Sequence, residues 1–242
     1  MLGAVIRIMS ALSCSICSFA KSSIGRKMIV AITGLALVIF LAGHLIGNLL
    51  VFAGPEAFND YAQFLHTFLH GGGVWIARIG LLACLVLHVT FTVLLTKENK
   101  AARPKYEHET TVQAPKSSLI MIWSGLTILA FIIFHLLHFT VKAGSDFASL
   151  IETLPDGSTR HDAHAMVIAG FSNFFVSLFY VISMTLLCSH LSHGVAAIFQ
   201  TLGLRTKKTA GAIMILSKAY AIVIYVGFIS IPIAILIFGF GS

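Results

Sequence analysis

Five long apolar segments divide this chain and restrict the folds open to it. They alternate with segments rich in charged and turn-forming residues, and each holds about the 20 residues that a helix needs to cross about 30 Å of hydrocarbon. The sequence therefore predicts an all-α membrane protein with a single five-helix transmembrane domain over residues 23–242. Its helices are expected over residues 28–53, 74–96, 117–141, 166–193 and 212–238.

The composition excludes several other classes of protein. Of the 242 residues, 57% are apolar and 10% are charged, whereas an ordinary soluble domain has about 25% charged residues. The net charge of +7 is not arranged as a basic stripe interleaved with aromatic residues, which argues against nucleic-acid binding. No P-loop or HExxH motif is present, so nucleotide and metalloprotease chemistry are not expected on this chain.

The basic residues predict how the helices are oriented. Most Lys and Arg residues precede the first helix, separate the second from the third, or separate the fourth from the fifth, and such residues collect on the cytoplasmic side. We therefore expect a cytoplasmic N-terminus and an outer C-terminus, with Arg78, Lys142 and Arg160 near the outer face. Residues 1–22 are expected to form a surface segment and not a signal peptide, because Arg7 interrupts the apolar region.

Histidine is the unusual residue of the apolar segments. Six of the eleven histidines lie in or at the edge of predicted helices, where an ionisable side chain is costly and points to a function. For any one of them, a neutral imidazole bonded to a neighbouring helix is the alternative. The six are His44, His88, His135, His138, His190 and His193.

These histidines fall at two depths. At 1.5 Å per residue, His44 lies roughly 26 Å and His135 roughly 28 Å beyond the cytoplasmic basic residues, near the outer face. His88 lies about 13 Å from them, and His190 and His193 about 22 and 18 Å, nearer the cytoplasm. Two imidazoles at one depth can ligate one haem iron from opposite sides, so two levels predict two haems.

Zinc or copper fits this pattern less well than haem. Such a site would draw on HxxxH spacing or on additional Cys and carboxylate ligands, and the predicted helices carry no acidic residue. Cys14 and Cys17 form a lone CxxC pair, whereas Cys84 and Cys188 lie inside predicted helices. All four cysteines are expected to be structural.

Glycines accompany the histidines along the predicted helices. A glycine lets a helix approach a planar cofactor closely, although the same spacing is common in plain helix contacts. The glycines concerned are Gly34, Gly43 and Gly47 on the first helix, Gly125 on the third and Gly194 on the fourth.

From about residue 22 onward the sequence resembles a known family, the cytochrome b558 subunit of succinate dehydrogenase and fumarate reductase. The form that it resembles has one large membrane anchor with two haems b. The stretches that carry the resemblance are SSIGRKMIVAITGLALVIFLAGHLIGN, FNDYAQFL, FHLLHF and HLSHGVAAIFQTLGL. The resemblance implies that His44 and His135 ligate the distal haem and that His88 and His190 ligate the proximal haem.

Two of these ligands have an alternative. His138 lies one turn beyond His135, about 33 Å from the cytoplasmic residues and past the hydrocarbon edge, so depth favours His135. His193 is closer in depth to His88, but the family pattern of a ligand followed by glycine four residues later selects His190. His138 and His193 are then expected to bond a haem propionate, a loop or water.

The resemblance implies an electron-transfer subunit of the respiratory chain, located in the bacterial inner membrane, with no catalytic residue of its own. A flavoprotein with covalent FAD performs the dicarboxylate chemistry. An iron-sulfur subunit passes electrons to the proximal haem, and the distal haem exchanges them with a quinone, expected to be menaquinone. We expect the cytoplasmic basic rim to dock the iron-sulfur subunit, and Lys142, Arg160 and residues 56–70 to shape an outer quinone site.

Two other functions stay open at this point. A dihaem cytochrome b that anchors a hydrogenase or a formate dehydrogenase would have the same four histidines but different soluble partners. A proton-coupled transporter would use intramembrane histidines as a proton relay and would bind no haem.

Overall fold

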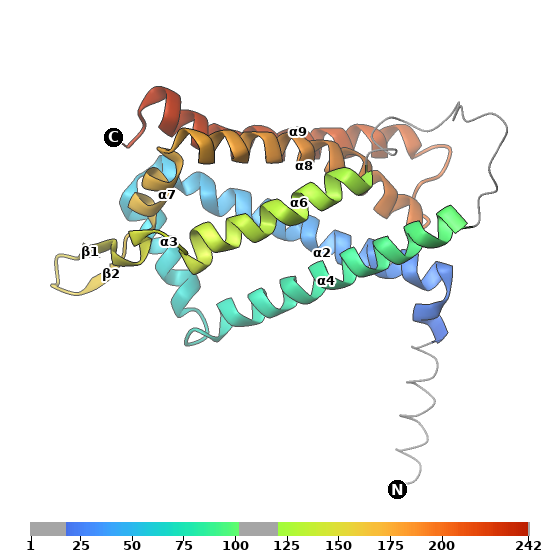
Figure 1. The fold of residues 1–242 in the computed structure, drawn as a ribbon, viewed down its shortest axis with the longest axis horizontal. Coiled ribbons are helices and arrows are strands. Elements are labelled where there is room, and N and C mark those ends of the chain that lie inside the picture. Colours follow the sequence, from blue (N-terminus) through green and yellow to red (C-terminus); the bar gives the residue numbers. More distant parts are fainter. Residues whose placement is uncertain (1–17, 102–120, 242) are drawn as a thin grey trace, which may run out of the picture.

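The computed structural model describes residues 18–101 and 121–241, which form a bundle of five long helices (Figure 1). Five segments are long and apolar enough to cross a membrane, where a helix satisfies its own backbone hydrogen bonds. The predicted all-α membrane bundle is confirmed, and the chain is a multi-pass membrane protein. The long helices are α2 (Ser23–Leu49), α4 (Gly72–Ala101), α6 (Met121–His135), α8 (Phe174–Thr201) and α9 (Ala210–Phe238).

Two of these helices continue in a different helical form. α2 is prolonged by the 3-10 helix η1 (Leu50–Ala53), and α6 by a π-helical turn, η2 (Leu136–Val141). Lys142 then adopts a left-handed conformation with φ of 60°, which ends the helix. The first residues of the predicted third span, 117–120, lie outside the described residues, as does most of the predicted surface segment 1–22.

The predicted fourth helix, over residues 166–193, is wrong at its start. The structure divides this apolar segment into α7 (Ala163–Phe171) and α8, which continues to Thr201. Asn173 caps α8, and its side-chain oxygen accepts hydrogen bonds from the amides of Phe175 and Val176 at 3.0 and 3.2 Å. An Asn cap competes with continuation of the preceding helix, an effect that the hydropathy of the segment does not register.

Two segments without predicted structure are ordered at one end of the bundle. Residues 54–70 contain the helix α3 (Pro55–Thr67), with proline in its first turn, where the missing N–H costs nothing. The segment between α6 and α7 contains the 3-10 helix η3 (Asp146–Ser149) and an antiparallel hairpin of β1 (Ile151–Thr153) and β2 (Thr159–His161).

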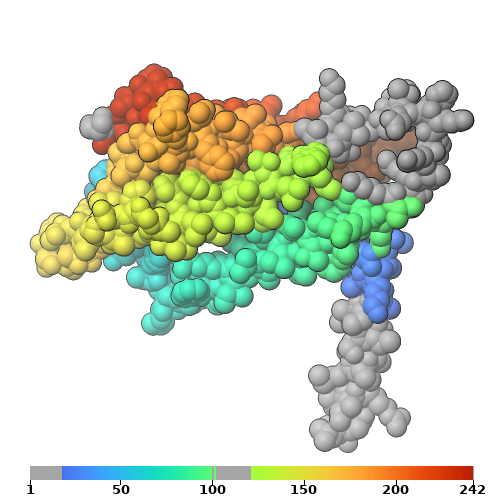
Figure 2. Space-filling model, viewed as in Figure 1, coloured from blue at the N-terminus to red at the C-terminus, as the bar shows by residue number. Residues whose placement is uncertain are grey.

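α2 is the central helix of the bundle. It packs against α4, α8 and α9, while α8 also packs against α6 and α9. Gly227 of α9 permits a close approach to α2, since a Cβ atom there would lie 2.7 Å from the Leu45 side chain. Figure 2 shows α4 and α6 on one face of the molecule. No side chain that the structure describes on α4 is fully buried, as expected for a helix that faces lipid over much of its surface.

The two ends of the bundle differ in chemistry. We call the end with Lys21, Arg26, Lys27, Lys97, Arg205, Lys207 and Lys208 the basic end, and the end formed by α3, η3, β1, β2 and α7 the hairpin end (Figure 1). At the basic end, Arg26 of α2 forms an ion pair with Glu98 of α4. At the hairpin end, acidic and basic side chains are interleaved and extensively paired.

Candidate functional site

His44 of α2 and His135 of α6 face one another near the hairpin end. Their ring centres are 5.9 Å apart, and the ring planes cross at 82°. Two imidazoles on opposite sides of one metal ion, each with a metal–nitrogen bond of about 2 Å, have ring centres about 6 Å apart. The separation of this pair, called the outer pair below, therefore suits axial ligation of one haem iron.

Tyr180 of α8 orients His135. Its hydroxyl oxygen lies 3.1 Å from Nδ1 of His135 and 3.3 Å from Nδ1 of His138, and its side chain is buried. A hydroxyl has one proton, so the tyrosine donates to one of the two imidazoles and accepts from the other. When His135 is the donor through Nδ1, its Nε2 is the lone-pair nitrogen and is free to bind a metal.

His138 has a different environment from His135. Its ring contacts the rings of Phe134, Phe139 and Phe147 as well as Tyr180. Among the ring contacts of the described residues, His44 meets His135 and does not meet His138. The structure thus joins His44 to the residue that depth had favoured, and it leaves His138 as a partner of Tyr180.

His88 of α4 and His190 of α8 form the second predicted pair, called the inner pair below. Nδ1 of His88 lies 3.2 Å from the carbonyl oxygen of Val30 on α2, to which it can only donate. Nδ1 of His190 lies 3.3 Å from the Ser124 hydroxyl of α6, which itself donates to the Met121 carbonyl. In both histidines Nδ1 carries the proton, and Nε2 is again left without a hydrogen bond from any described residue.

Two glycines sit directly against the inner pair. A Cβ atom added to Gly34 of α2 would lie 3.2 Å from Cε1 of His88, and one added to Gly125 of α6 would lie 3.7 Å from Cε1 of His190. Each glycine precedes a histidine of the outer pair by ten residues on its own helix. The two pairs are therefore separated by about 15 Å along the bundle, a stacking that α2 and α6 repeat independently.

Three of the four predicted ligands share one arrangement. In His88, His135 and His190, a group on a neighbouring helix holds Nδ1 and leaves Nε2 available, as is typical of metal-ligating histidines. His44 differs, because the Asn48 amide lies over its ring, 3.3 Å from Nδ1 and 3.4 Å from Nε2. The donor set fits two bis-histidine haems.

His193 shows less of this organisation. It is half-buried on α8. Within the described part of the chain, no side chain of another helix bonds either of its ring nitrogens. His190 is the better-oriented candidate ligand of α8.

The remaining metal-binding residue types are dispersed. In residues 18–101 and 121–241, no three or more His, Cys, Asp and Glu side chains are grouped to hold a metal ion, a criterion that does not cover a two-histidine haem site. Cys84 and Cys188 are free thiols, each half-buried. Cys14 and Cys17 lie outside the described residues.

Asn59 is the centre of a polar network at the hairpin end. It is 1% exposed, and its amide donates to Glu152 at 2.9 Å and to Asp162 at 3.0 Å. Its side-chain oxygen accepts from the His164 amide at 2.9 Å. Arg160 forms ion pairs with Glu152 and Asp60. These bonds join α3, the hairpin and α7 into one unit.

The charges of this network depend on these bonds. Hydrogen bonds from Arg160 and Asn59 hold the pKa of Glu152 below its ordinary value. Burial opposes ionisation of Asp162, but hydrogen bonds from the Ala165 amide and from Asn59 outweigh it and lower its pKa. Both carboxylates are ionised at neutral pH, and Glu152 together with Asp60 compensates the charge of Arg160.

Arg160 and Lys142, two expected members of an outer quinone site, are in different situations. The Arg160 side chain is 6% exposed and engaged by two carboxylates. Lys142 instead lies 2.9 Å from Nε2 of His161, whose Nδ1 bonds the Leu150 carbonyl. Burial and the nearby Lys142 lower the pKa of His161, and burial with Arg78 and Lys142 lowers that of His66. Both ring nitrogens of His161 are engaged, so the remaining N–H groups of Lys142 and the His66 imidazole are the groups left to bond a ligand.

The sequence reasoning missed Ser124, Tyr180 and Asn59, and also Thr33, whose hydroxyl oxygen lies 3.4 Å from Nδ1 of His88. Each is buried in the structure. The signal available in the sequence was a polar residue within or beside an apolar segment. Their partners lie 45 to 105 residues away in the chain, so no local pattern identifies them.

Comparison of the chain with known protein families, with curated proteins and with solved structures finds no match.

Proposed function

We propose that this chain is the dihaem membrane anchor of a succinate:quinone oxidoreductase, a succinate dehydrogenase or fumarate reductase, in the bacterial inner membrane. It carries electrons between an iron-sulfur subunit at the basic end and a quinone, menaquinone in this proposal, at the hairpin end. The dicarboxylate chemistry takes place on a partner flavoprotein with FAD. The proposal rests on the sequence resemblance together with one structural observation, the close approach of the His44 and His135 rings.

The histidine pairs support haem binding through their hydrogen bonds. In His88, His135 and His190 a neighbouring helix holds Nδ1, and Nε2 has no hydrogen bond within the described residues. Holding Nδ1 on a neighbouring helix fixes the ring orientation and raises the basicity of Nε2. When bound, each haem b supplies a one-electron redox centre.

The two ends support the proposed partners. The basic end offers exposed Lys and Arg side chains, including Lys97, Lys207 and Lys208, to a soluble subunit with an acidic face. At the hairpin end, the Lys142 ammonium donates to Nε2 of His161 and has further N–H groups that could donate a hydrogen bond to a carbonyl oxygen of a quinone. His66, whose pKa is lowered by burial and then by Arg78 and Lys142, lies near the same place.

The test is a haem and flavin analysis of the complex purified from membranes in mild detergent. We expect two haems b per chain, a dithionite-reduced α band, and a co-purifying subunit with covalent flavin. His88→Ala should retain one haem per chain, whereas the matched control His70→Ala, at an exposed loop position, should retain both. A colourless preparation would exclude the haem proposal. Two haems with a hydrogenase or formate dehydrogenase partner would exclude the succinate assignment alone.

A further inference from the structure

We propose that the seam between α2 and α8 at the basic end binds the headgroup of an anionic phospholipid. Lys27 and Thr201 contact its phosphate in this proposal, and an acyl chain enters an apolar hollow farther along the same seam. The proposal requires only that the helices cross a membrane, so it does not depend on haem binding or on the partner subunits.

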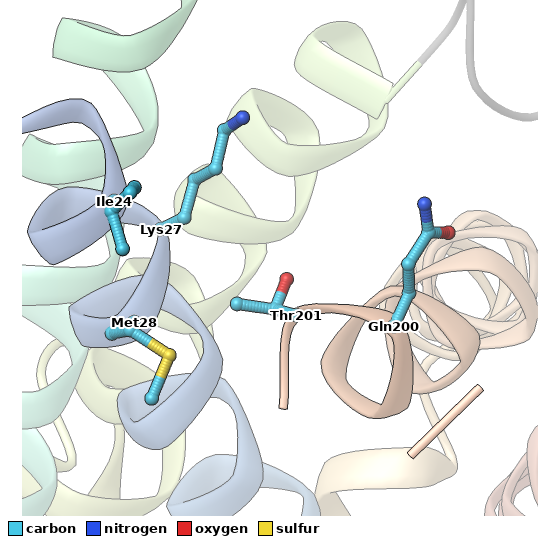
Figure 3. A pocket seen from close by; sticks show the side chains of 5 residues that line it. All are labelled: Ile24, Lys27, Met28, Gln200 and Thr201. Carbon is cyan, nitrogen blue, oxygen red and sulfur yellow. The ribbon is translucent and has the colours of Figure 1, made fainter. Parts of the chain in front are cut away.

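A hollow of about 280 Å³ lies at this point. Ile24, Lys27 and Met28 of α2 line one side, and Gln200 and Thr201 of α8 line the other (Figure 3). The polar ends of Lys27, Gln200 and Thr201 point to the same side of the hollow in Figure 3. An ammonium, an amide and a hydroxyl on one side are the donors that a phosphate diester accepts from.

The charge of the hollow comes from Lys27. Arg26, its neighbour, is turned to α4 and neutralised by Glu98, whereas Lys27 has no acidic partner among the described residues. Arg205 adds a second positive charge at the edge, since it donates to the Gln200 side chain at 2.9 Å. The end of α8 contributes a partial negative charge and the start of α2 a partial positive one. Because these two oppose each other, the side chains of Lys27 and Arg205 make the net charge of the hollow positive.

The depth of the hollow suits a lipid headgroup. Lys27 lies in the second turn of α2, and Thr201 is the last residue of α8, so both lie at an end of a membrane-spanning helix, where headgroups are found. Basic pockets between transmembrane helices are known binding sites for anionic headgroups. A soluble anion without an apolar part would gain no favourable contact from the apolar Ile24 and Met28 side chains that line the same hollow.

A second hollow, of about 180 Å³ and with an entirely apolar lining, continues the seam. Leu35 and Val38 of α2 line it, seven and ten residues beyond Met28 and on the same face of the helix, which places it about 10 Å deeper. Leu35 and Leu216 at its edge are exposed, so the hollow opens toward the lipid. An acyl chain is the occupant that fits a charged hollow followed by an apolar one.

The experiment measures phospholipid binding to the purified full-length protein in detergent by native mass spectrometry. Dioleoyl phosphatidylglycerol should bind with a Kd at least about fivefold lower than dioleoyl phosphatidylcholine, since a lysine near an anionic headgroup is worth about 1 kcal/mol. Lys27→Gln should raise the phosphatidylglycerol Kd about fivefold to tenfold, while Lys27→Arg should preserve binding. Glycerol 3-phosphate alone should bind far more weakly, because it lacks the acyl chains.

Lys207→Gln is the matched control, since Lys207 is an exposed cation of the same end outside the hollow. It should change the phosphatidylglycerol Kd less than twofold. Equal effects of Lys27→Gln and Lys207→Gln would overturn the proposal in favour of a general attraction to basic charge. Displacement of bound phosphatidylglycerol by a menaquinone analogue would instead assign the seam to quinone. If Lys27→Gln does not fold, Thr201→Val tests the same contact.

Discussion

The hydroxyl oxygen of Tyr180 lies 3.1 Å from Nδ1 of His135, and the two residues come from different helices, α8 and α6. The same hydroxyl reaches His138, one turn farther along the chain. Tyr180 therefore engages Nδ1 of His135, whose Nε2 has no hydrogen bond among the described residues. It is a positioning residue for the outer pair in the function proposed above.

Tyr180→Phe should raise the midpoint potential of one of the two haems by tens of millivolts. Loss of the acceptor for the Nδ1 proton makes the imidazole a weaker electron donor, and about 59 mV corresponds to a tenfold change for one electron. Potentiometric titration of both haems is the measurement. Tyr225→Phe, which removes a tyrosine hydroxyl elsewhere between α8 and α9, should leave both potentials unchanged. An unchanged pair of potentials in Tyr180→Phe would contradict the assigned role.

Alanine substitution of the two histidines of α8 should give opposite results. His190→Ala should lose one haem per chain, because Ser124 holds Nδ1 of His190 and leaves Nε2 available, whereas His193→Ala should retain two. Haem is measured per chain by the pyridine haemochrome method. Full loading of the His190 variant with loss in the His193 variant would transfer the ligand role to His193.

The outer pair provides a parallel comparison. His44→Ala and His135→Ala should each lose one haem, and His138→Ala should retain both, because His138 bonds Tyr180 and makes no ring contact with His44 among the described residues. The same haem determination applies. Loss of haem in His138→Ala together with full loading in His135→Ala would assign the outer ligand to His138.

Gly34→Ala should weaken the inner haem site. Its new Cβ would lie 3.2 Å from Cε1 of His88, so the ring must shift by a few tenths of an ångström, and displacement of a ligand weakens metal binding by about tenfold or more. Haem content after detergent washing and the low-spin EPR signal report the change. Gly80→Ala, on α4 with no atom near its Cβ position, is the control. Equal haem retention in both variants would show that His88 does not need this close approach.

Asn59→Ala should destabilise the hairpin end by about 2 kcal/mol or more, because Glu152, Asp162 and the His164 amide each lose a buried partner. Unfolding of the detergent-solubilised protein by denaturant, with protection of residues 150–162 from hydrogen exchange, measures this effect. Gln63→Ala removes a polar side chain of the same helix that makes one long contact with Arg160, at 3.5 Å. Gln63→Ala should lower the free energy of unfolding only slightly. Equal losses of stability in Asn59→Ala and Gln63→Ala would argue against the network.

Acid should loosen the hairpin end. The pKa values of Glu152 and Asp162 are lowered in the folded state, so their contribution to stability is present above their ordinary values of about 4 and is lost as the pH falls below them. Hydrogen exchange of residues 150–162, corrected for intrinsic rates, should show protection at pH 7 that declines below about pH 4. Glu152→Gln should make this protection less dependent on pH. A wild-type hairpin that is as well protected at pH 3 as at pH 7 would refute the prediction.

The sequence alone determined the five spans and singled out the histidines of two depths. Both follow from local properties: an apolar stretch of about 20 residues forms a helix in lipid, and an ionisable side chain there is costly enough to be noticed. A constant rise per residue converts sequence position into depth. For this reason His44 could be grouped with His135 before any helix packing was known, whereas the choice of His190 over His193 as the partner of His88 came from the family resemblance.

Only the tertiary structure decided how the helices are rotated about their axes, and hence which side chains meet. Rotation brings Tyr180 to His135, Ser124 to His190 and Gly34 to His88, contacts between residues that are distant in the chain. The break before α8 and the Asn59 network likewise depend on specific hydrogen bonds that outweigh average hydropathy. Depth is encoded locally because helix rise is constant. Rotation is not, because it depends on the packing of every helix against its neighbours.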